Sequence, residues 1–227
     1  MALGRRIIVA TVKGVMRLIC RIDDTQLARV PQQGPLIVVT NHVNILEIPI
    51  IYTHLQPRPV TGFVAAYRWG SRLLGWLLDA CGAIPLRRGE ADLAAMRRGV
   101  EMLKAGHILV IAPEGTRSGH GRLQKAPPGV VLLALHSGAP LLPLVYYGGE
   151  RYRDNLRRLR RTDFHIVVGK PFTLDAGGVK VTRQVRRQMI DEVMYHMSAL
   201  LPPAYRGVYS DLNPATETYL TFHSGLS

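Results

Sequence analysis

A histidine with a carboxylate five positions further on is the pair of residues most suited to chemistry in this chain. His42 follows a short apolar run, 35–39, that has the pattern of a buried strand, and Glu47 leads into further apolar residues of helical pattern. An imidazole at the end of a strand can take a proton from a hydroxyl, and a nearby carboxylate can hold the ring in the required tautomer. The pair therefore predicts a general base, although an isolated histidine of this kind is more often an ordinary loop residue.

Three later stretches carry further recognisable patterns. Their sequences are GAIPLRRG at 82–89, PEGTRS at 113–118 and APLLPLV at 139–145. In order and approximate spacing, these stretches and the His42 block resemble the blocks of the 1-acylglycerol-3-phosphate (lysophosphatidic acid) O-acyltransferase family. The resemblance runs from about Leu36 to about Val145, and 113–118 is its most specific part.

One position departs from the family pattern. The family has aspartate at the fifth position after the histidine, whereas this chain has Glu47. Glutamate carries the same charge on a side chain one methylene longer, and it can still accept the imidazole N–H if the backbone or the rotamer adjusts. The resemblance therefore implies that Glu47 orients His42. It also leaves open a protein that kept the fold and lost the activity.

The resemblance further implies a group of substrate-binding residues. Arginine suits a phosphate because its planar fork donates two parallel hydrogen bonds. Glycine in the 113–118 block lets the backbone turn sharply beside a ligand, and the glutamate before it is interpreted as positioning the arginine. The implied substrate-binding residues are Asn41, Arg88, Glu114, Gly115, Thr116, Arg117 and Lys125.

The implied reaction is transfer of a fatty acyl group to the free hydroxyl of lysophosphatidic acid, which gives phosphatidic acid in phospholipid biosynthesis. The acyl donor would be acyl-CoA or acyl carrier protein as co-substrate, and no cofactor is expected. No metal site is predicted, because no Cys/His cluster has ligand spacing. The alternatives are an acyltransferase for another lysolipid, such as a lyso-ornithine lipid, and a non-catalytic membrane- or lipid-binding protein.

Composition limits the class of partner. The chain has 227 residues, enough for one sizeable core, and 47% of them are hydrophobic. Its 29 Lys and Arg against 16 Asp and Glu give a net charge of +13, which favours an anionic partner. Nucleic acid is not expected, because no nucleic-acid-binding motif is present. Cys20 and Cys81 are expected to be core thiols.

Apolar runs that alternate with helical patterns predict an α/β fold. We expect a single domain with a mixed, largely parallel sheet flanked by helices. His42 and the Glu114–Arg117 loop both follow predicted strands, so they should converge at one sheet edge. Strands are predicted at 35–39, 60–66, 107–112, 141–147 and 164–169. Helices are predicted at 68–81, 91–105, 130–135 and 183–201, and the stripe of large apolar residues in 68–81 is expected either in the core or along an acyl-chain tunnel.

The N-terminal region reads as an amphipathic helix from Leu3 to Ile22. An apolar face opposite a basic one is typical of a helix in a membrane interface. The apolar face is Ile8, Val12, Val15 and Ile19, and the basic face is Arg6, Lys13, Arg17 and Arg21. We therefore expect an anionic membrane surface as partner and a peripheral location on the cytoplasmic face of the cell membrane.

The expected organisation is a membrane-associating element at 1–30, an acyltransferase domain at 31–205 and a C-terminal tail at 206–227, partly disordered. The uncharged run 126–149 is interrupted by Gly138, Pro140 and Pro143, so no spanning helix is predicted. Residues 151–161 contain six arginines, which we interpret as a solvated loop that faces lipid.

Overall fold

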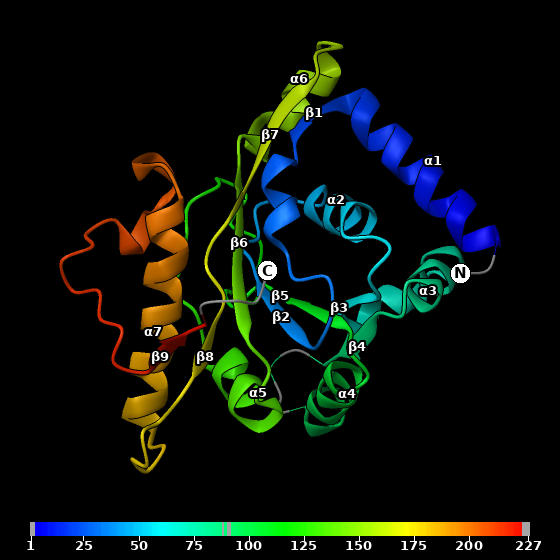
Figure 1. Ribbon diagram of the computed structural model, residues 1–227. Coiled ribbons are helices and arrows are strands. Elements are labelled where there is room, and N and C mark those ends of the chain that lie inside the picture. The colour runs from blue at the N-terminus through cyan, green and yellow to red at the C-terminus, as the bar shows by residue number, and fades with distance from the viewer. Residues whose placement is uncertain (1–2, 88, 90–91, 224–227) are drawn as a thin grey trace.

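The strands pair into a mixed sheet in the order β1-β7-β6-β2-β5-β3-β4, with β8 beside β6 and β9 beside β8 (Figure 1). The computed structural model describes residues 3–87, 89 and 92–223, apart from the side chains of Leu3 and Arg5. The strands are β1 Cys20–Asp23, β2 Leu36–Val39, β3 Val60–Ala65, β4 Ile84–Leu86, β5 Ile108–Ile111, β6 Leu141–Tyr147, β7 Thr162–Val168, β8 Phe172–Leu174 and β9 Leu220–Phe222.

Helices flank this sheet, so the predicted α/β architecture is confirmed. The α-helices are α1 Leu3–Ile19, α2 Glu47–His54, α3 Arg72–Ala80, α4 Leu93–Lys104, α5 Gly129–Ser137, α6 Tyr152–Arg157 and α7 Arg183–Leu200. Short 3-10 turns join them, among them η2 Ala66–Gly70, η3 Gly149–Arg151, η4 Pro203–Tyr205 and η5 Gly207–Tyr209.

The centre of the sheet is parallel. Strand β2 lies between β5 and β6 and is parallel to both. All four of its residues are buried, as expected for a strand covered on both faces, and this explains its continuous apolar sequence. Because parallel strands end at the same edge, the segments that follow β2, β5 and β6 meet there. Only β7 and β8 run antiparallel to β6 among the pairings of the described residues.

Two apolar cores cover the two faces of the sheet. Alternate residues of β2 divide between them: Ile37 and Val39 join the core with α4, α5 and α7, whereas Leu36 and Val38 join the core with α1 and α2. This alternation follows from the pleat, which directs successive side chains to opposite faces. In Figure 1, α1 and α2 lie on one side of the sheet and α7 on the other.

The N-terminal helix is shorter than predicted. It ends at Ile19, and the chain continues as β1, which pairs with β7. Met16 is buried, whereas Val15 is 47% exposed, so the face toward the protein is rotated from the predicted one. The reason is that α1 packs on α2, which the periodicity of α1 alone does not specify. None of the described helices is long and apolar enough to cross a bilayer.

The helix predicted at 68–81 is divided and lies at the surface. Residues 66–70 form η2, and α3 begins only at Arg72, with Ser71 accepting the N–H of Leu74 as an N-cap. Leu73 and Trp76 are exposed, so the expectation of a core stripe is wrong for them. Their helical spacing is that of an amphipathic face, but Leu73 is 77% exposed and Trp76 59% exposed.

The arginine-rich stretch 151–161 is not a loop. Its first half forms η3 and α6, which follow β6, and the chain then turns into β7. The prediction that the segment is solvated is confirmed, since all six of its arginines are exposed.

The described part of the C-terminal segment, 206–223, is ordered, against the expectation of partial disorder after 205. Strand β9 pairs with β8, which pairs with β6. On α7, the buried carboxylate of Glu192 accepts the N–H groups of Thr218 at 3.1 Å and Tyr219 at 3.0 Å. A charged acceptor thus holds a polar segment, and sequence periodicity does not reveal such a contact.

Candidate active site

His42 and Glu47 form a hydrogen-bonded pair just beyond the carboxyl end of β2. Nδ1 of His42 lies 2.7 Å from Oε2 of Glu47. The side chain of His42 is 18% exposed, whereas that of Glu47 is buried. When Nδ1 donates to the carboxylate, Nε2 is the nitrogen that can accept a proton, which is the arrangement of a general base.

The longer side chain of glutamate is accommodated at this position. Glu47 is the first residue of α2, and its carboxylate folds back over the preceding turn. Its second oxygen, Oε1, accepts the N–H of Val43 at 3.0 Å and the N–H of Asn44 at 2.6 Å. The extra methylene therefore lets one carboxylate bind both the imidazole and the backbone of the turn that carries it.

Burial raises the pKa of Glu47 above its ordinary value. Hydrogen bonds from His42, Asn44 and Val43 oppose this effect because they stabilise the charged form. The three donors thus support a carboxylate at a buried position, where an unpaired charge would be costly.

Two asparagines fix the backbone around the histidine. The amide of Asn41 donates to the carbonyl of Tyr146 at 2.8 Å and accepts the N–H of the same residue at 2.9 Å, which ties the end of β2 to β6. The amide of Asn44 donates to the carbonyl of Gly149 at 2.8 Å. Both side chains are buried. The amide of Asn41 is therefore bonded to the main chain of β6, and its contact with substrate stays a prediction.

Glu114 follows β5 and is turned into the protein. Its Oε2 accepts the backbone N–H of His42, and its Oε1 accepts the N–H of Gln124, both at 2.8 Å. Burial raises the pKa of Glu114 to about 7, although these two N–H groups lower it in part. Glu114 was expected to bind substrate or to position Arg117. Its carboxylate instead connects the histidine to the segment that follows the 113–118 block.

The loop after Glu114 is bonded directly to the histidine segment. Gly115 has φ +71°, a left-handed conformation that favours glycine. The N–H of Ser118 donates to the carbonyl of His42 at 2.7 Å, and the N–H of Gly119 donates to the carbonyl of Val43 at 3.1 Å. These two main-chain hydrogen bonds hold the 113–118 block against the segment that carries His42, and they do not depend on the side chains of the block.

The cations expected to bind phosphate lie around this loop. Thr116 and Arg117 are exposed on it, and Lys125 is exposed next to Gln124. Because the loop bonds to His42 and Gln124 bonds to Glu114, these side chains are brought to the same region. Arg88 lies outside the described residues.

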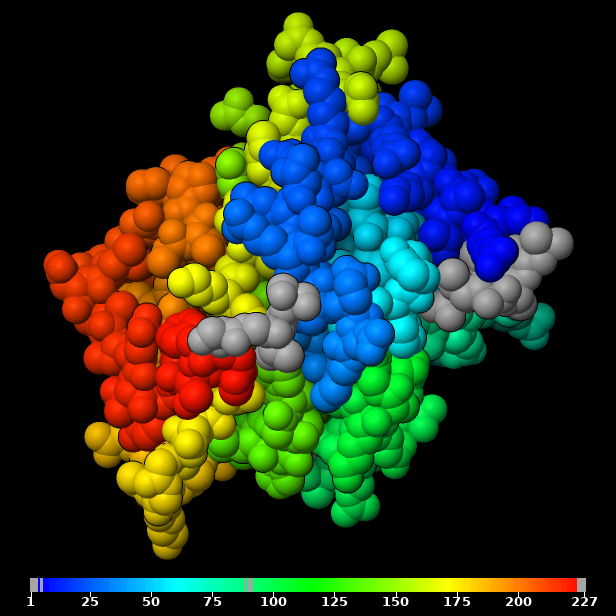
Figure 2. Space-filling view, in the orientation of Figure 1, coloured from blue at the N-terminus to red at the C-terminus, as the bar shows by residue number. Residues whose placement is uncertain are grey.

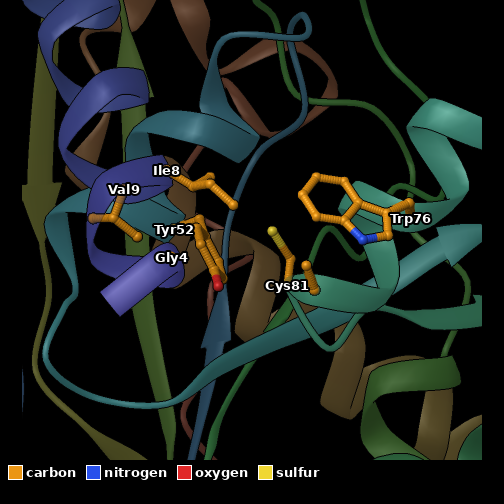
Figure 3. Close-up of a pocket in the computed structure, with 7 residues that line it drawn as sticks. Gly4, Ile8, Val9, Tyr52, Trp76 and Cys81 are labelled. Carbon is orange, nitrogen blue, oxygen red and sulfur yellow. The ribbon is translucent and has the colours of Figure 1, made fainter. Parts of the chain in front are cut away.

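An apolar pocket of about 200 Å³ lies between α1, α2 and α3 (Figure 3). The ring of Trp76 and the side chain of Ile8 approach it from opposite sides, with Cys81 between them. The helix whose apolar stripe was expected to wall an acyl-chain tunnel therefore does line a cavity, although part of that stripe is exposed. The lining residues are Gly4, Ile8, Val9, Tyr52, Trp76, Ala80 and Cys81.

Proton transfer at the imidazole is the chemistry that this arrangement supports. In the described part of the chain, no group of three or more His, Cys, Asp or Glu side chains could hold a metal ion. Cys20 is buried and Cys81 half-buried, and neither forms a disulfide.

Comparison with known families adds an independent observation. A family model described as acyltransferase matches residues 21–147, more than half of the chain. The chain belongs to the acyltransferase family. The matched range contains the His42–Glu47 pair, the Glu114 loop and Lys125, so the candidate site lies within the part of the chain that the family model covers.

Several curated proteins are similar to this acyltransferase. The 1-acyl-sn-glycerol-3-phosphate acyltransferase of Pseudomonas aeruginosa is 35% identical over 80% of this chain and 71% of its own length. The lyso-ornithine lipid O-acyltransferase of the same organism is 33% identical over 58% of this chain and 55% of its own. A chloroplastic 1-acyl-sn-glycerol-3-phosphate acyltransferase of Brassica napus is 28% identical over 60% of this chain, which spans only 40% of that relative.

A solved structure shares the fold. The 1-acyl-sn-glycerophosphate acyltransferase PlsC of Thermotoga maritima aligns with a TM-score of 0.58 at 20% identity, over 86% of this chain and 80% of that one. At this identity the likeness concerns the fold, and it agrees with the mixed sheet flanked by helices.

Sequence reasoning missed residues that position the site of this acyltransferase. Asn44 is the clearest example, because its amide accepts the N–H of Leu46 at 2.8 Å and so shapes the turn before α2. The available signal was the residue type, since asparagine commonly bonds the backbone two residues on. Tyr146 carried no such signal, because its contribution is made by main-chain atoms.

Proposed function

We propose that this acyltransferase moves a fatty acyl group from acyl-CoA or acyl carrier protein to the free hydroxyl of lysophosphatidic acid, giving phosphatidic acid. The observation that carries the proposal is the His42–Glu47 pair, held at 2.7 Å at the carboxyl edge of the sheet. The relatives named as 1-acyl-sn-glycerol-3-phosphate acyltransferases support the substrate class.

In this mechanism, Nε2 of His42 removes the proton from the acceptor hydroxyl as its oxygen attacks the thioester carbonyl carbon. The carbon–sulfur bond then breaks, and the imidazolium returns the proton to the departing thiolate. Glu47 holds the ring tautomer and stabilises the imidazolium. A positioned general base typically contributes about a hundred- to ten-thousand-fold in rate. The thioester carries the acyl group, so no cofactor is required.

The acceptor phosphate would be bound by the exposed cations beside the loop. Arg117 and Lys125 are the described candidates, and Arg88 is proposed from the sequence pattern alone. Thr116 and the backbone of Gly115 lie on the same exposed loop and could add hydrogen bonds. The bonds from Ser118 and Gly119 to the histidine segment keep this loop in register with the base.

The acyl chain would lie against the apolar pocket between α1, α2 and α3. Its volume of about 200 Å³ is smaller than that of typical small-molecule sites. It would therefore hold only part of a long chain, and bulk added at Ala80 should favour shorter acyl donors.

A peripheral location on the cytoplasmic face of the cell membrane suits such a substrate. On α1, the apolar side chains of Ile7 and Leu18 are exposed, and so are Arg6 and Arg17. An exposed apolar stripe beside cations is the pattern of a helix that lies in an interface.

A lyso-ornithine lipid is the second candidate acceptor, and a specific relative favours it. Lysophosphatidic acid carries a head-group phosphate and a lyso-ornithine lipid does not, so the decisive comparison is between the KM values for these two acceptors. If Arg117 and Lys125 bind phosphate, Arg117→Ala should raise KM for lysophosphatidic acid and change KM for a lyso-ornithine lipid little.

The central experiment measures acyl transfer to lysophosphatidic acid from labelled acyl-CoA and acyl carrier protein. We expect His42→Ala to lower kcat by about a hundred- to ten-thousand-fold. Glu47→Asp should lower it by up to about 100-fold, because a shorter side chain withdraws the carboxylate from the imidazole. Glu47→Gln should lower it further, because an amide cannot accept on both sides.

Two results would overturn the proposal. A serine or cysteine acylated by donor alone would indicate a covalent mechanism instead. Turnover absent in the wild type with every lysolipid, despite membrane binding, would favour the non-catalytic lipid-binding alternative.

A further inference from the structure

The segment 151–161 forms a projecting tip that the proposed chemistry does not use. It consists of the end of η3, helix α6 and the turn into β7, and Figure 2 shows it standing out from the body of the molecule at the top of the view. Two leucines are exposed on it, Leu156 by 50% and Leu159 by 95%. Its cations, which with these leucines we call the arginine–leucine tip, are Arg151, Arg153, Arg157, Arg158, Arg160 and Arg161.

Leu159 occupies a backbone position that normally selects glycine. Helix α6 ends in a Schellman motif: the N–H of Arg160 donates to the carbonyl of Asn155 at 2.8 Å, and the N–H of Leu159 donates to that of Leu156 at 3.1 Å. Leu159 has φ +52°, and it is the only residue besides glycines with a positive φ in the described part of the chain. Its side chain thus neither packs against the protein nor suits its backbone, so folding does not account for a leucine here.

Few carboxylates balance the arginines of the tip. Asp154 is the one acid in the segment. It lies 3.7 Å from Arg157, and an exposed ion pair of this kind contributes little to stability. The side chains of Arg158 and Arg160 have no hydrogen-bond or ion-pair partner among the described residues. The tip therefore presents the unpaired guanidinium groups of Arg158 and Arg160 beside exposed leucine side chains.

The tip lies at the same edge of the sheet as the histidine. Strand β6 leads into it and is parallel to β2, which leads to His42. Strand β7 begins at Thr162, three residues before the residue that pairs with Tyr147, so the ribbon extends past the end of β6. The side chain of Arg161 donates to the carbonyl of Cys20 at 2.7 Å and so connects the tip to the end of α1 (Figure 1).

The end of α1 continues the same surface. Leu18 is 75% exposed there, and Arg17, whose carbonyl accepts a bond from Arg161 at 2.6 Å, is exposed beside it. Exposed leucines surrounded by arginines are thus contributed by two segments far apart in the sequence.

We propose that the arginine–leucine tip docks on an anionic phospholipid bilayer, with Leu156 and Leu159 inserted at the boundary between head groups and acyl chains. Guanidinium groups pair with lipid phosphates, and leucines gain free energy in the apolar layer. The inference rests on the proposed function in one respect, since the bilayer is where a lysophospholipid acceptor would reach the nearby histidine. An acidic carrier protein would also match the charge, but it would leave unexplained a strained leucine that is almost fully exposed.

The test measures binding of the full chain to phosphatidylcholine vesicles with and without phosphatidylglycerol. Leu159→Gly should keep or raise the melting temperature, because glycine suits the left-handed backbone. It should nevertheless weaken vesicle binding about tenfold. Arg158→Glu/Arg160→Glu should weaken binding to anionic vesicles on the order of 30-fold or more, an effect that salt reduces.

A matched control lies at the opposite end of the molecule. Residues 179–183, before and at the start of α7, also expose two valines, Val179 and Val181, and two cations (Figure 1). Lys180→Glu/Arg183→Glu carries the same charge change, and Val179→Gly removes a similar apolar side chain. If the position of the charges and not the net charge of the protein determines binding, both control variants should bind vesicles within about twofold of the wild type.

Acyl transfer in detergent micelles separates this inference from the proposed function. Tip variants with unchanged activity in micelles and weakened vesicle binding support the inference. If the protein has no transferase activity but its vesicle binding depends on the tip, the proposed function is wrong and the membrane-docking inference is supported. Unchanged vesicle binding in both tip variants overturns the inference, and a loss confined to assays with acyl carrier protein would assign the tip to that protein instead.

Discussion

His42 is held by two buried carboxylates with different tasks. Glu47 binds the ring nitrogen, whereas Glu114 binds the backbone N–H of the same residue. The charge of Glu47 contributes to the raised pKa of Glu114, as expected for neighbouring acids that share a poorly solvated site. One histidine is therefore fixed at both its main chain and its side chain, by groups that follow two adjacent strands.

Glu114 should make the stability of the protein depend on pH. Its pKa is about 7 in the folded protein against an ordinary 4.5, so the folded state binds the extra proton. Stabilisation from this group is complete below about pH 4.5 and is lost as pH rises toward 7, on the order of 3 kcal/mol in all. Denaturant unfolding of the wild type and of Glu114→Gln between about pH 4.5 and pH 8 measures this change in the free energy of unfolding.

The difference between the two proteins isolates Glu114 from the other titrating groups. At pH 4.5 the glutamine variant should be less stable by about 1–3 kcal/mol, because its amide leaves one buried N–H without an acceptor. The gap should close or reverse by pH 8. A gap that stays constant with pH would show that the pKa of Glu114 is not raised.

At the scale of elements, the C-terminal segment acts as a strap over the region that follows the 113–118 block. The N–H of Leu123 donates to the carbonyl of Tyr205 at 3.0 Å, and the carbonyl of Leu123 accepts the N–H of Val208 at 3.3 Å. The hydroxyl of Tyr205 donates to Glu150 at 2.8 Å. Turns η4 and η5 thus hold Leu123 one residue away from the N–H that binds Glu114.

Gly207→Ala should break this strap. Gly207 has φ +54°, and an added Cβ would lie 2.1 Å from the carbonyl oxygen of Leu123. Gly177→Ala is the matched control, because Gly177 has φ +57° and open space around it. Thermal unfolding should show a loss of about 1–2 kcal/mol for the control. The loss for Gly207→Ala should be larger by roughly 2 kcal/mol or more.

Equal destabilisation of the two alanine variants would show that the contact between residue 207 and Leu123 relaxes without loss of stability. If the strap also positions the loop, Gly207→Ala should raise KM for the acceptor in the transfer assay, and Gly177→Ala should leave it unchanged.

At the scale of the whole molecule, a buried arginine closes the edge of the sheet opposite the site. Arg58 is 6% exposed, and burial lowers its pKa from the ordinary value. Its guanidinium donates to the carbonyls of Pro31 at 2.6 Å, Gly106 at 3.0 Å and Gly34. Pro31 and Gly34 precede β2 and Gly106 precedes β5, so the side chain joins these two loops to its own, which precedes β3.

Arg58→Met should destabilise the protein, because it leaves three carbonyl groups without this donor. The expected loss is about 3 kcal/mol. For a chain of this size that corresponds to a fall in Tm on the order of 10 °C. Arg29→Met, at an exposed position at the end of the 3-10 turn Thr25–Arg29, is the control and should change Tm by about 1–2 °C or less. A similar Tm for both variants would contradict the assigned role.

The sequence by itself determined the central strands, the two loops that follow them and the presence of His42, Glu47 and the 113–118 block at one sheet edge. Buried parallel strands are continuous apolar runs, and parallel strands end together, so both follow from local pattern. Only the tertiary structure decided that Asn41 binds Tyr146, that Glu114 faces inward, and that Leu73 and Trp76 of α3 stay exposed. It also decided that Glu192 and Arg58 order polar segments. The physical reason is that hydrogen bonds to buried main-chain groups join residues far apart in sequence and leave no periodic trace in the residues that make them.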